Sequence, residues 1–373
     1  MKTLINGRLI VPDESGNFVI ALGKALNFGE KIFSIGEPVG SEIIDVQGAF
    51  VSSGFINVHI HGADSVDTMD DDIAALKRLA KFLPTTGVTS FLPTTMTMPL
   101  EKIHAALTRI RAAKKFSDGA RILGAHLEGP FISKKFHGAQ NPADIIPADF
   151  ALIEPFADVI KIITVAPEEC PDEFITRCRR RSIVVSIGHS AAASDEALRA
   201  IDLGANHITH LFNAQTGIHH RQGGVALAAL ISHATVELIA DDVHVCPAAQ
   251  CLVAKCKPRS EIVLVTDSFR ACGVGDGESS LGGQKVFVRG TLATLADGTI
   301  AGSVASMNTV LKNFRNNVGW DVPACVELVT KNPALELNLY DKLGSLEAGK
   351  LADITCFDDN FNILRTFIGG REI

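Results

Sequence analysis

Short runs in which apolar and polar residues alternate occur at both ends of the chain, a pattern typical of β-strands. These runs cover 3–11, 31–36, 41–51, 344–358 and 361–373. Gly, Asn and Pro separate them and indicate turns. Because short strands cannot bury their apolar faces alone, we predict that 1–52 and 343–373 fold together as one small β-sandwich domain.

Between the two ends, β-type runs alternate with longer segments that carry apolar residues at helical spacing. The eight β-type runs are 54–62, 87–95, 121–130, 158–168, 182–190, 205–214, 235–245 and 261–268. The helical segments are 71–86, 99–116, 170–181, 194–204 and 247–256. Eight alternations over about 280 residues predict an α/β fold, with a (β/α)8 TIM-like barrel over 53–342 rather than an open doubly wound sheet.

Polar residues gather at the carboxyl ends of the β-type runs, which share one face in a parallel barrel. They are His59, His61, Glu128, His189, His210, His244 and Asp267. His59 and His61 are two residues apart in a strand, so both imidazoles point to the same side. Each residue alone has a plainer alternative: a buried core histidine, a solubilising glutamate in a helix or loop, or a helix-capping aspartate. Their accumulation at one end of six runs favours a common site.

Imidazoles and carboxylates suit zinc or ferrous iron, and open coordination positions would make such a site catalytic. We therefore predict a divalent metal ion as cofactor. Five other histidines are expected to matter less for this chemistry. His104, His207 and His233 are expected at the surface, and His219 and His220 precede Arg221 in a loop.

The composition of the 373 residues, 46% hydrophobic and 21% charged, is that of an ordinary globular protein. The formal charge of −7 opposes attraction to nucleic-acid phosphates and to anionic membrane surfaces, so neither is expected as a partner. No apolar run approaches the roughly 20 residues that span a bilayer. The eight cysteines form no CxxC pair and the polar start contains no secretory segment, so we expect a cytoplasmic protein with reduced thiols.

Several motifs follow one another in the order found in a known family. They are GFINVHIHG, AHLEGPF, GHS, THLFNA, HHRQGG, DDVHV, LVTDS, AGS and KNPALELNLYDKLGSLEAGKLADI. Together they resemble the N-acetylglucosamine-6-phosphate deacetylases of the amidohydrolase superfamily, and the resemblance covers essentially the whole chain. HLEGP with HLFNA is its most specific part, whereas HxH and GxLxxGxxAD occur across the wider superfamily.

The resemblance implies a role for individual residues. It places the principal metal ligands at Glu128, His189 and His210, and the catalytic acid/base, which also belongs to the metal site, at Asp267. His59 and His61 add ligands that allow a second ion bridged by Glu128, hence one or two ions per subunit. Substrate contacts are implied at Ala139, Gln140, Asn213, Ala214, Arg221, His244, Ile300, Ala301 and Gly302. Arg221 would clamp a phosphate with its fork of donors, and His244 would assist at the carbonyl.

The implied reaction is hydrolysis of the N-acetyl group of N-acetylglucosamine 6-phosphate to glucosamine 6-phosphate and acetate, in a homodimer. Three alternatives stay open: the same reaction on the galactosamine epimer, hydrolysis of a cyclic amide on the same barrel, and an inactive scaffold that serves as an interaction protein. Asp242 stands where this family usually has glycine, two residues before His244. We expect Asp242 to affect that loop and the sugar preference.

Overall fold

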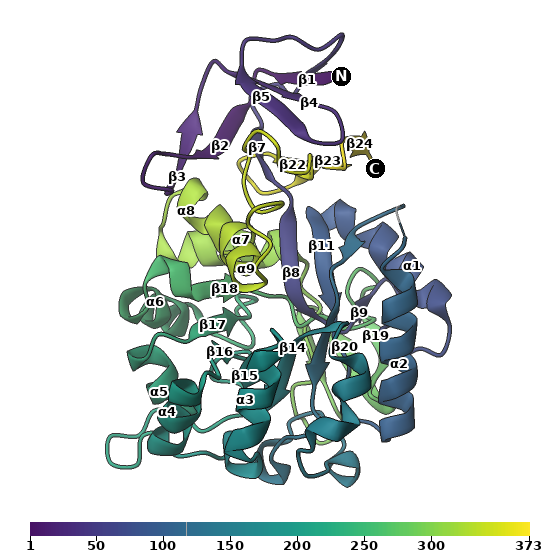
Figure 1. Ribbon diagram of the computed structural model, residues 1–373, viewed down its shortest axis with the longest axis vertical. Coiled ribbons are helices and arrows are strands. Elements are labelled where there is room, and N and C mark those ends of the chain that lie inside the picture. The colour runs from purple at the N-terminus through teal and green to yellow at the C-terminus, as the bar shows by residue number, and fades with distance from the viewer. Residues whose placement is uncertain (117) are drawn as a thin grey trace.

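The computed structural model describes residues 1–116 and 118–373. Figure 1 shows sheets built from both ends of the chain at one end of the molecule, with the parallel strands and most helices below them. Within the described residues, every helix is too short or too polar to cross a lipid bilayer.

The expected β-type runs form parallel strands that curl around a common interior. Six lie in one sheet in chain order: β13 (Ala125–Glu128), β14 (Ile160–Val165), β15 (Val184–Ile187), β16 (His207–Ile208), β17 (Thr235–Leu238) and β18 (Ile262–Leu264). The other two, β8 (Phe55–Ile60) and β11 (Val88–Pro93), pair in parallel beside the short β12 (Arg121–Ile122). Single parallel bridges, Thr94 with His126 and Ile60 with Ser268, connect the two sheets at both edges. This mixed α/β arrangement is consistent with the predicted barrel.

The five predicted helices are confirmed. They are α1 (Ile73–Phe82), α2 (Leu100–Ala113), α3 (Asp172–Arg180), α4 (Ser194–Leu203) and α6 (Pro247–Cys256). Helix α6 has the predicted bounds, and the other four are shorter than their segments. In α1, Leu76 and Leu79 lie on the buried face, and the Asp72 carboxylate caps the first turn by accepting from the Ala74 N–H. The described part of the chain also contains helices that were not predicted: α5 (Val225–Ile231), α7 (Met307–Val318), α8 (Val322–Glu327) and α9 (Lys331–Glu336).

Short 3-10 helices occur in the connections. They are η1 (Leu83–Thr86), η2 (Lys134–Phe136), η3 (Pro142–Asp144), η4 (Phe150–Leu152), η5 (Glu154–Phe156), η6 (Pro167–Glu169) and η7 (Arg259–Glu261). Inside the curled sheet, Ile56, Val58 and Val263 pack with Ala334 and Leu343 from the chain in and after α9. Apolar side chains therefore fill this part of the interior.

Both ends of the chain contribute to the terminal sheets. One sheet has the order β5-β4-β1-β6 and the other β24-β23-β22-β7-β2-β3. Their strands are β1 (Lys2–Ile5), β2 (Arg8–Pro12), β3 (Phe18–Ala21), β4 (Ala25–Phe28), β5 (Ile32–Gly36), β6 (Glu42–Asp45), β7 (Phe50–Ser53), β22 (Ile354–Phe357), β23 (Ile363–Ile368) and β24 (Arg371–Glu372). Phe28 and Phe367 meet edge to face at 5.3 Å within an apolar cluster shared by both sheets. The two chain ends therefore bury one another's apolar faces.

A three-stranded antiparallel sheet between Asp267 and α7 was not predicted. It consists of β19 (Gly277–Leu281), β20 (Gln284–Arg289) and β21 (Leu292–Thr294). Leu281 and Val286 pack in one cluster with Met96 and Phe269, so this sheet lies beside the carboxyl ends of the parallel strands. A much shorter pair, β9 (Gly62–Ala63) with β10 (Val66–Asp67), follows β8.

Candidate active site

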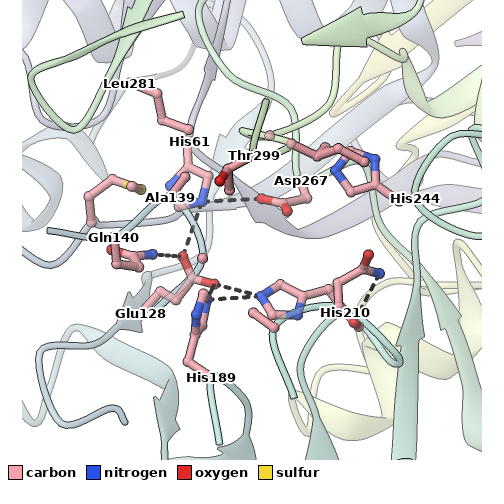
Figure 2. Close-up of a pocket in the computed structure, with 16 residues that line it drawn as sticks. His61, Glu128, Ala139, Gln140, His189, His210, His244, Asp267, Leu281 and Thr299 are labelled. Atoms are coloured by element: carbon pink, nitrogen blue, oxygen red, sulfur yellow. Dashed lines mark hydrogen bonds and ion pairs between the residues drawn. The ribbon is translucent and has the colours of Figure 1, made fainter. Parts of the chain in front are cut away.

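The carboxyl ends of the parallel strands bring together the polar residues singled out in the sequence, as Figure 2 shows for most of them. His59 lies within β8 and His61 directly follows it, and Glu128 is the last residue of β13. His189 and His210 each lie two residues beyond their strands, and Asp267 lies three residues beyond β18. All six side chains are buried.

Glu128 lies at the centre of this cluster. Its Oε1 is 3.2 Å from His189 Nε2 and 3.1 Å from His210 Nε2, and these two nitrogens are 3.1 Å apart. Three potential ligand atoms from β13, β15 and β16 therefore face the same point. Gln140 holds the other oxygen, since its Nε2 donates to Glu128 Oε2 at 2.7 Å.

A second group of ligand atoms shares Glu128. His61 Nε2 is 3.2 Å from Glu128 Oε2, and His59 Nε2 is 3.4 Å from Glu128 Oε1. Asp267 Oδ1 lies 3.3 Å from His59 Nε2 and 3.2 Å from His61 Nε2. The two groups of potential ligand atoms thus overlap at the Glu128 carboxylate.

Hydrogen bonds of the outer ring nitrogens orient three of the histidines. His189 Nδ1 lies 3.0 Å from the Phe136 carbonyl, His61 Nδ1 3.2 Å from the Thr94 carbonyl, and His59 Nδ1 2.7 Å from Glu237 Oε2. Because these oxygens only accept, each Nδ1 carries a hydrogen, and a neutral ring then directs a lone pair on Nε2 into the site. His59 Nε2 is buried without a hydrogen-bond partner. Inward lone pairs around a carboxylate fit a divalent metal ion.

The electrostatics of the cluster also favour a cation. Burial alone would lower the pKa of His59, but Glu237, Asp267 and Glu128 outweigh it and raise that pKa to about 9. Burial would likewise raise the pKa of Glu128, yet the surrounding histidines hold it well below its usual value. The cluster therefore retains positive charge, either as protons on its imidazoles or as a metal ion in their place.

The backbone adopts uncommon angles at three of these residues. His189, His210 and Asp267 have φ values of 49°, 30° and 47°, in a region that residues other than glycine seldom occupy. Hydrogen bonds hold Asp267 there, because its N–H donates to the His59 carbonyl at 3.0 Å and its carbonyl accepts from the Ser303 N–H at 2.9 Å. Such backbone strain is typical of functional sites.

His244 reaches the same cavity from the loop after β17, where Asp241 orients it. Asp241 Oδ2 accepts from His244 Nδ1 at 2.7 Å, and its Oδ1 accepts from the His244 backbone N–H at 2.8 Å. Asp242 has a left-handed φ of 67°, which explains why glycine suits this position. The Asp242 carboxylate accepts from Gln250 and Asn317, so it is turned toward α6 and α7 rather than toward the cavity.

A cavity of about 280 Å³ adjoins this cluster and is bordered by His61, Glu128, His189, His210, His244 and Asp267. Of the residues expected to contact substrate, Ala139, Gln140, Asn213, Ala214, His244, Ile300 and Gly302 line it. Four lining residues were not predicted: Met96, Gly138, Leu281 and Thr299. Ala301 is buried behind the wall. Arg221 is exposed and does not line the cavity, and its Nη1 lies 2.9 Å from His220 Nε2.

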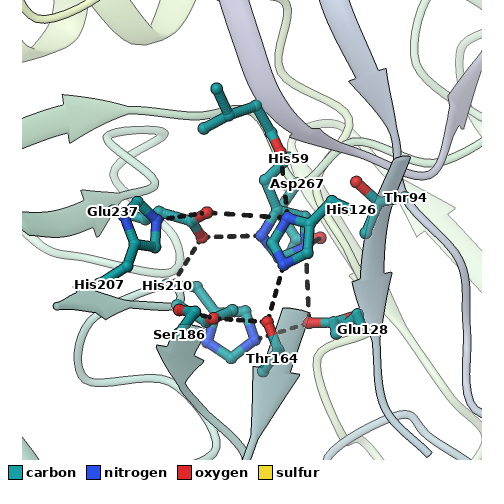
Figure 3. Close-up of polar contacts among 12 residues, drawn as sticks. His59, Thr94, His126, Glu128, Thr164, Ser186, His207, His210, Glu237 and Asp267 are labelled. Carbon is teal, nitrogen blue, oxygen red and sulfur yellow. Dashed lines mark hydrogen bonds and ion pairs between the residues drawn. The ribbon is translucent and has the colours of Figure 1, made fainter. Parts of the chain in front are cut away.

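The expectation that His207 lies at the surface was wrong. Its side chain is fully buried, with Nε2 3.0 Å from Glu237 Oε1 and Nδ1 2.7 Å from Glu336 Oε1. Figure 3 shows His207 on one side of Glu237 and His59 on the other. Sequence reasoning missed Glu237 because it lies within an apolar run; a lone acid in such a run is itself a signal, since unpaired acids are seldom buried.

Comparison with known proteins agrees with this geometry. Residues 50–373 match the amidohydrolase family. The N-acetylglucosamine-6-phosphate deacetylase of Bacillus subtilis (strain 168) is 39% identical over 90% of this chain and 87% of its own length. The N-acetylgalactosamine-6-phosphate deacetylase of Escherichia coli O157:H7 is 33% identical over 93% of each chain. A crystal structure of N-acetylglucosamine-6-phosphate deacetylase from Pasteurella multocida has a TM-score of 0.94 at 30% identity, covering 100% of this chain and 99% of that one. The resemblance to these deacetylases is thereby confirmed, and the chain belongs to the amidohydrolase family.

Proposed function

We propose that this protein hydrolyses the N-acetyl group of N-acetylglucosamine 6-phosphate, giving glucosamine 6-phosphate and acetate. The observation that carries the proposal is the buried cluster of four imidazoles around Glu128, with Asp267 and His244 at the adjoining cavity. The names of the Bacillus subtilis and Pasteurella multocida proteins support this substrate.

Glu128, His189 and His210 would hold a divalent metal ion, and His59, His61 and Asp267 would complete a second position that shares Glu128. Zinc and iron suit these ligands best. When bound, the ion supplies Lewis acidity at the amide carbonyl and lowers the pKa of a water molecule.

Asp267 is the proposed acid/base. Burial would raise its pKa, but His59 and His61 hold that pKa below its usual value, so the group starts as a carboxylate able to accept a proton. It takes a proton from the water that attacks the carbonyl carbon and returns it to the nitrogen as the C–N bond breaks. His244, whose Nδ1 is bound to Asp241, directs its other nitrogen to the substrate as a hydrogen-bond donor.

We also propose that the residues lining the cavity hold the sugar, and that Arg221 clamps its phosphate from the neighbouring exposed loop. The described residues lining the cavity include neither lysine nor arginine, so the phosphate needs a cationic partner from outside the lining. Several features remain predictions. They are the domain limits at 1–52 with 343–373 and at 53–342, a terminal β-sandwich beside a full (β/α)8 barrel, a homodimer and a cytoplasmic location.

The proposal is tested by measuring acetate release from N-acetylglucosamine 6-phosphate and from its galactosamine epimer, with protein whose metal content has been counted. We expect release from the gluco compound that is lost on chelation and restored by metal. The similarity to the Escherichia coli galactosamine enzyme makes the epimer the second candidate, and release only from the epimer would select it. If metal-loaded protein released acetate from neither compound, both substrate assignments would be contradicted. Hydrolysis of a cyclic amide and an inactive scaffold would then be the remaining candidate functions.

Replacing Arg221 by Met is expected to lower kcat/KM for the phosphorylated sugar by about ten- to a hundred-fold, because a charge-assisted bidentate contact is lost. Activity on the unphosphorylated N-acetyl sugar should change little. Both substrates would be assayed on one preparation. Arg180→Met, at an exposed position at the end of α3, serves as the matched control. Equal losses for the two sugars would contradict the phosphate clamp.

A further inference from the structure

Four ionisable side chains form a buried line that leads from the cluster of potential metal ligands to α9: His59, Glu237, His207 and Glu336. Figure 3 shows the first three of them. We infer that Glu237, paired with His207, is a positioning residue that fixes the ring of His59 so that its Nε2 can bind a metal ion. The inference rests on the proposed metal site, and neither Glu237 nor His207 faces the cavity.

The hydrogen-bond partners of His207 determine its charge. Its two ring nitrogens face one carboxylate each, Glu237 at 3.0 Å and Glu336 at 2.7 Å. Because ionised carboxylates only accept, both nitrogens must donate, and the ring is then an imidazolium. In agreement, although burial would lower its pKa, Glu336 and Glu237 raise the pKa of His207 to about 10. A buried cation therefore lies directly behind Glu237.

This cation allows Glu237 to remain an anion inside the protein, where an unpaired charge is costly. The second oxygen of Glu237, Oε2, accepts from His59 Nδ1 at 2.7 Å and from the His210 backbone N–H at 3.0 Å. With the side chains of His59 and Glu237 fully enclosed, no water can replace these bonds. The other tautomer of His59 would place a lone pair against the carboxylate, so the hydrogen stays on Nδ1 and Nε2 faces the site.

A deeper metal site formed by His59, His126 and Glu237 is the rival interpretation of these contacts. Both nitrogens of His126 already have partners, since Nδ1 lies 3.0 Å from the Val58 carbonyl and Nε2 lies 2.7 Å from Thr164 Oγ1. With no lone pair free on His126, the geometry favours the positioning role.

The substitution Glu237→Gln removes the negative charge of this side chain but keeps its shape. An amide oxygen in the place of Oε2 can still accept from His59 and from the His210 N–H, and its NH2 group then faces His207. His207 must lose the proton on Nε2 to accept from this group, so the contacts survive while the charges on residues 237 and 207 disappear. A carboxylate behind a metal-binding histidine increases the basicity of the ring, and loss of such partners typically costs about 10- to 100-fold in metal affinity.

The test is zinc affinity measured by chelator competition on the full chain, together with the melting temperature. The variants are Glu237→Gln, His59→Asn and the double variant. Glu327→Gln is the control, because Glu327 is also buried, accepts from the Phe18 N–H at 2.6 Å and pairs with Arg259 at 2.9 Å, on α8. We expect Glu237→Gln to weaken the same zinc equivalent as His59→Asn by about ten-fold or more, and Glu327→Gln to leave zinc affinity unchanged.

The double variant decides whether Glu237 acts through His59. We expect it to bind zinc no more weakly than His59→Asn alone, because the ring that Glu237 positions is then absent. Additive losses in the double variant, or zinc affinity of Glu237→Gln within about two-fold of wild type, would overturn the inference. These affinities do not depend on which sugar is hydrolysed, so failure of the proposed reaction is seen separately in the acetate assay.

A second measurement needs no change at Glu237. Long-range proton–nitrogen NMR correlations of the zinc-loaded wild type should include, among the zinc-bound histidines, a ring with a protonated Nδ1 and a zinc-bound Nε2 whose signals are lost in His59→Asn. A His59 ring bound to zinc through Nδ1, or one with its hydrogen on Nε2, would overturn the inference.

Discussion

Asp267→Asn is expected to lower turnover by at least about a hundred-fold while metal stays bound. Asparagine has nearly the same shape as aspartate, but it can neither accept the proton of the attacking water nor return it to the leaving nitrogen. Glu128, His189 and His210 form a group of potential ligands that does not include Asp267, so the principal ion should remain. Steady-state turnover and metal content would be measured on the same preparation.

The control for this variant is Asp70→Asn. Asp70 pairs at 2.7 Å with Arg270, which follows Asp267 closely along the chain. Asp70 itself does not line the cavity. Its turnover should be near that of wild type. Near-normal turnover in Asp267→Asn would remove Asp267 from the acid/base role, whereas loss of metal in that variant would assign Asp267 to metal binding first.

The unfolding free energy of the wild type, relative to His207→Gln, is expected to fall by a few kcal/mol as the pH rises from about 7 to about 10. Although burial lowers it, the pKa of His207 is raised to about 10 by Glu336 and Glu237, against an unfolded value near 6.5. A raised pKa stabilises the fold fully below the unfolded pKa, and this stabilisation is lost as the pH approaches the folded pKa. Urea unfolding of both proteins across this pH range measures the difference.

His233→Gln is the matched control, because the His233 side chain is fully exposed and its Nδ1 lies 3.6 Å from Glu261 Oε1. Its stability should follow the wild-type pH dependence. If the unfolding free energies of wild type and His207→Gln changed in parallel with pH, the two carboxylates would not be stabilising His207 as an imidazolium.

Much of the parallel part of the fold could be predicted because its signals are local. Each β-type run is continuous and apolar, and helices such as α1 carry their buried residues at regular spacing. Some strands are short, and β16 contains only His207 and Ile208. His189, His210 and Asp267 therefore lie on the turns that follow their strands, whereas His59 and Glu128 lie within theirs. Asp242 also follows a strand, and its left-handed backbone allows the side chain to turn away from the cavity.

The clustering of the ligand residues could be predicted because they share one end of the parallel strands. Their supporting partners could not, since each pairing depends on contacts between distant parts of the chain. His59 and Glu237 are separated by 178 positions, and His207 and Glu336 by 129. Gln140 illustrates the same limit, because only the fold shows that its side chain is engaged by Glu128 and by the Thr97 N–H.

The small sheet formed by β19, β20 and β21 contributes to the cavity wall but contains none of the potential metal ligands named above. Leu281, and the segment containing Thr299, Ile300 and Gly302 that follows the sheet, line one wall of the cavity, while the potential metal ligands come from the strand ends. This wall of the cavity and the potential metal ligands therefore come from different pieces of chain. Substitutions confined to 277–302 can reshape the cavity without replacing any of these ligand residues.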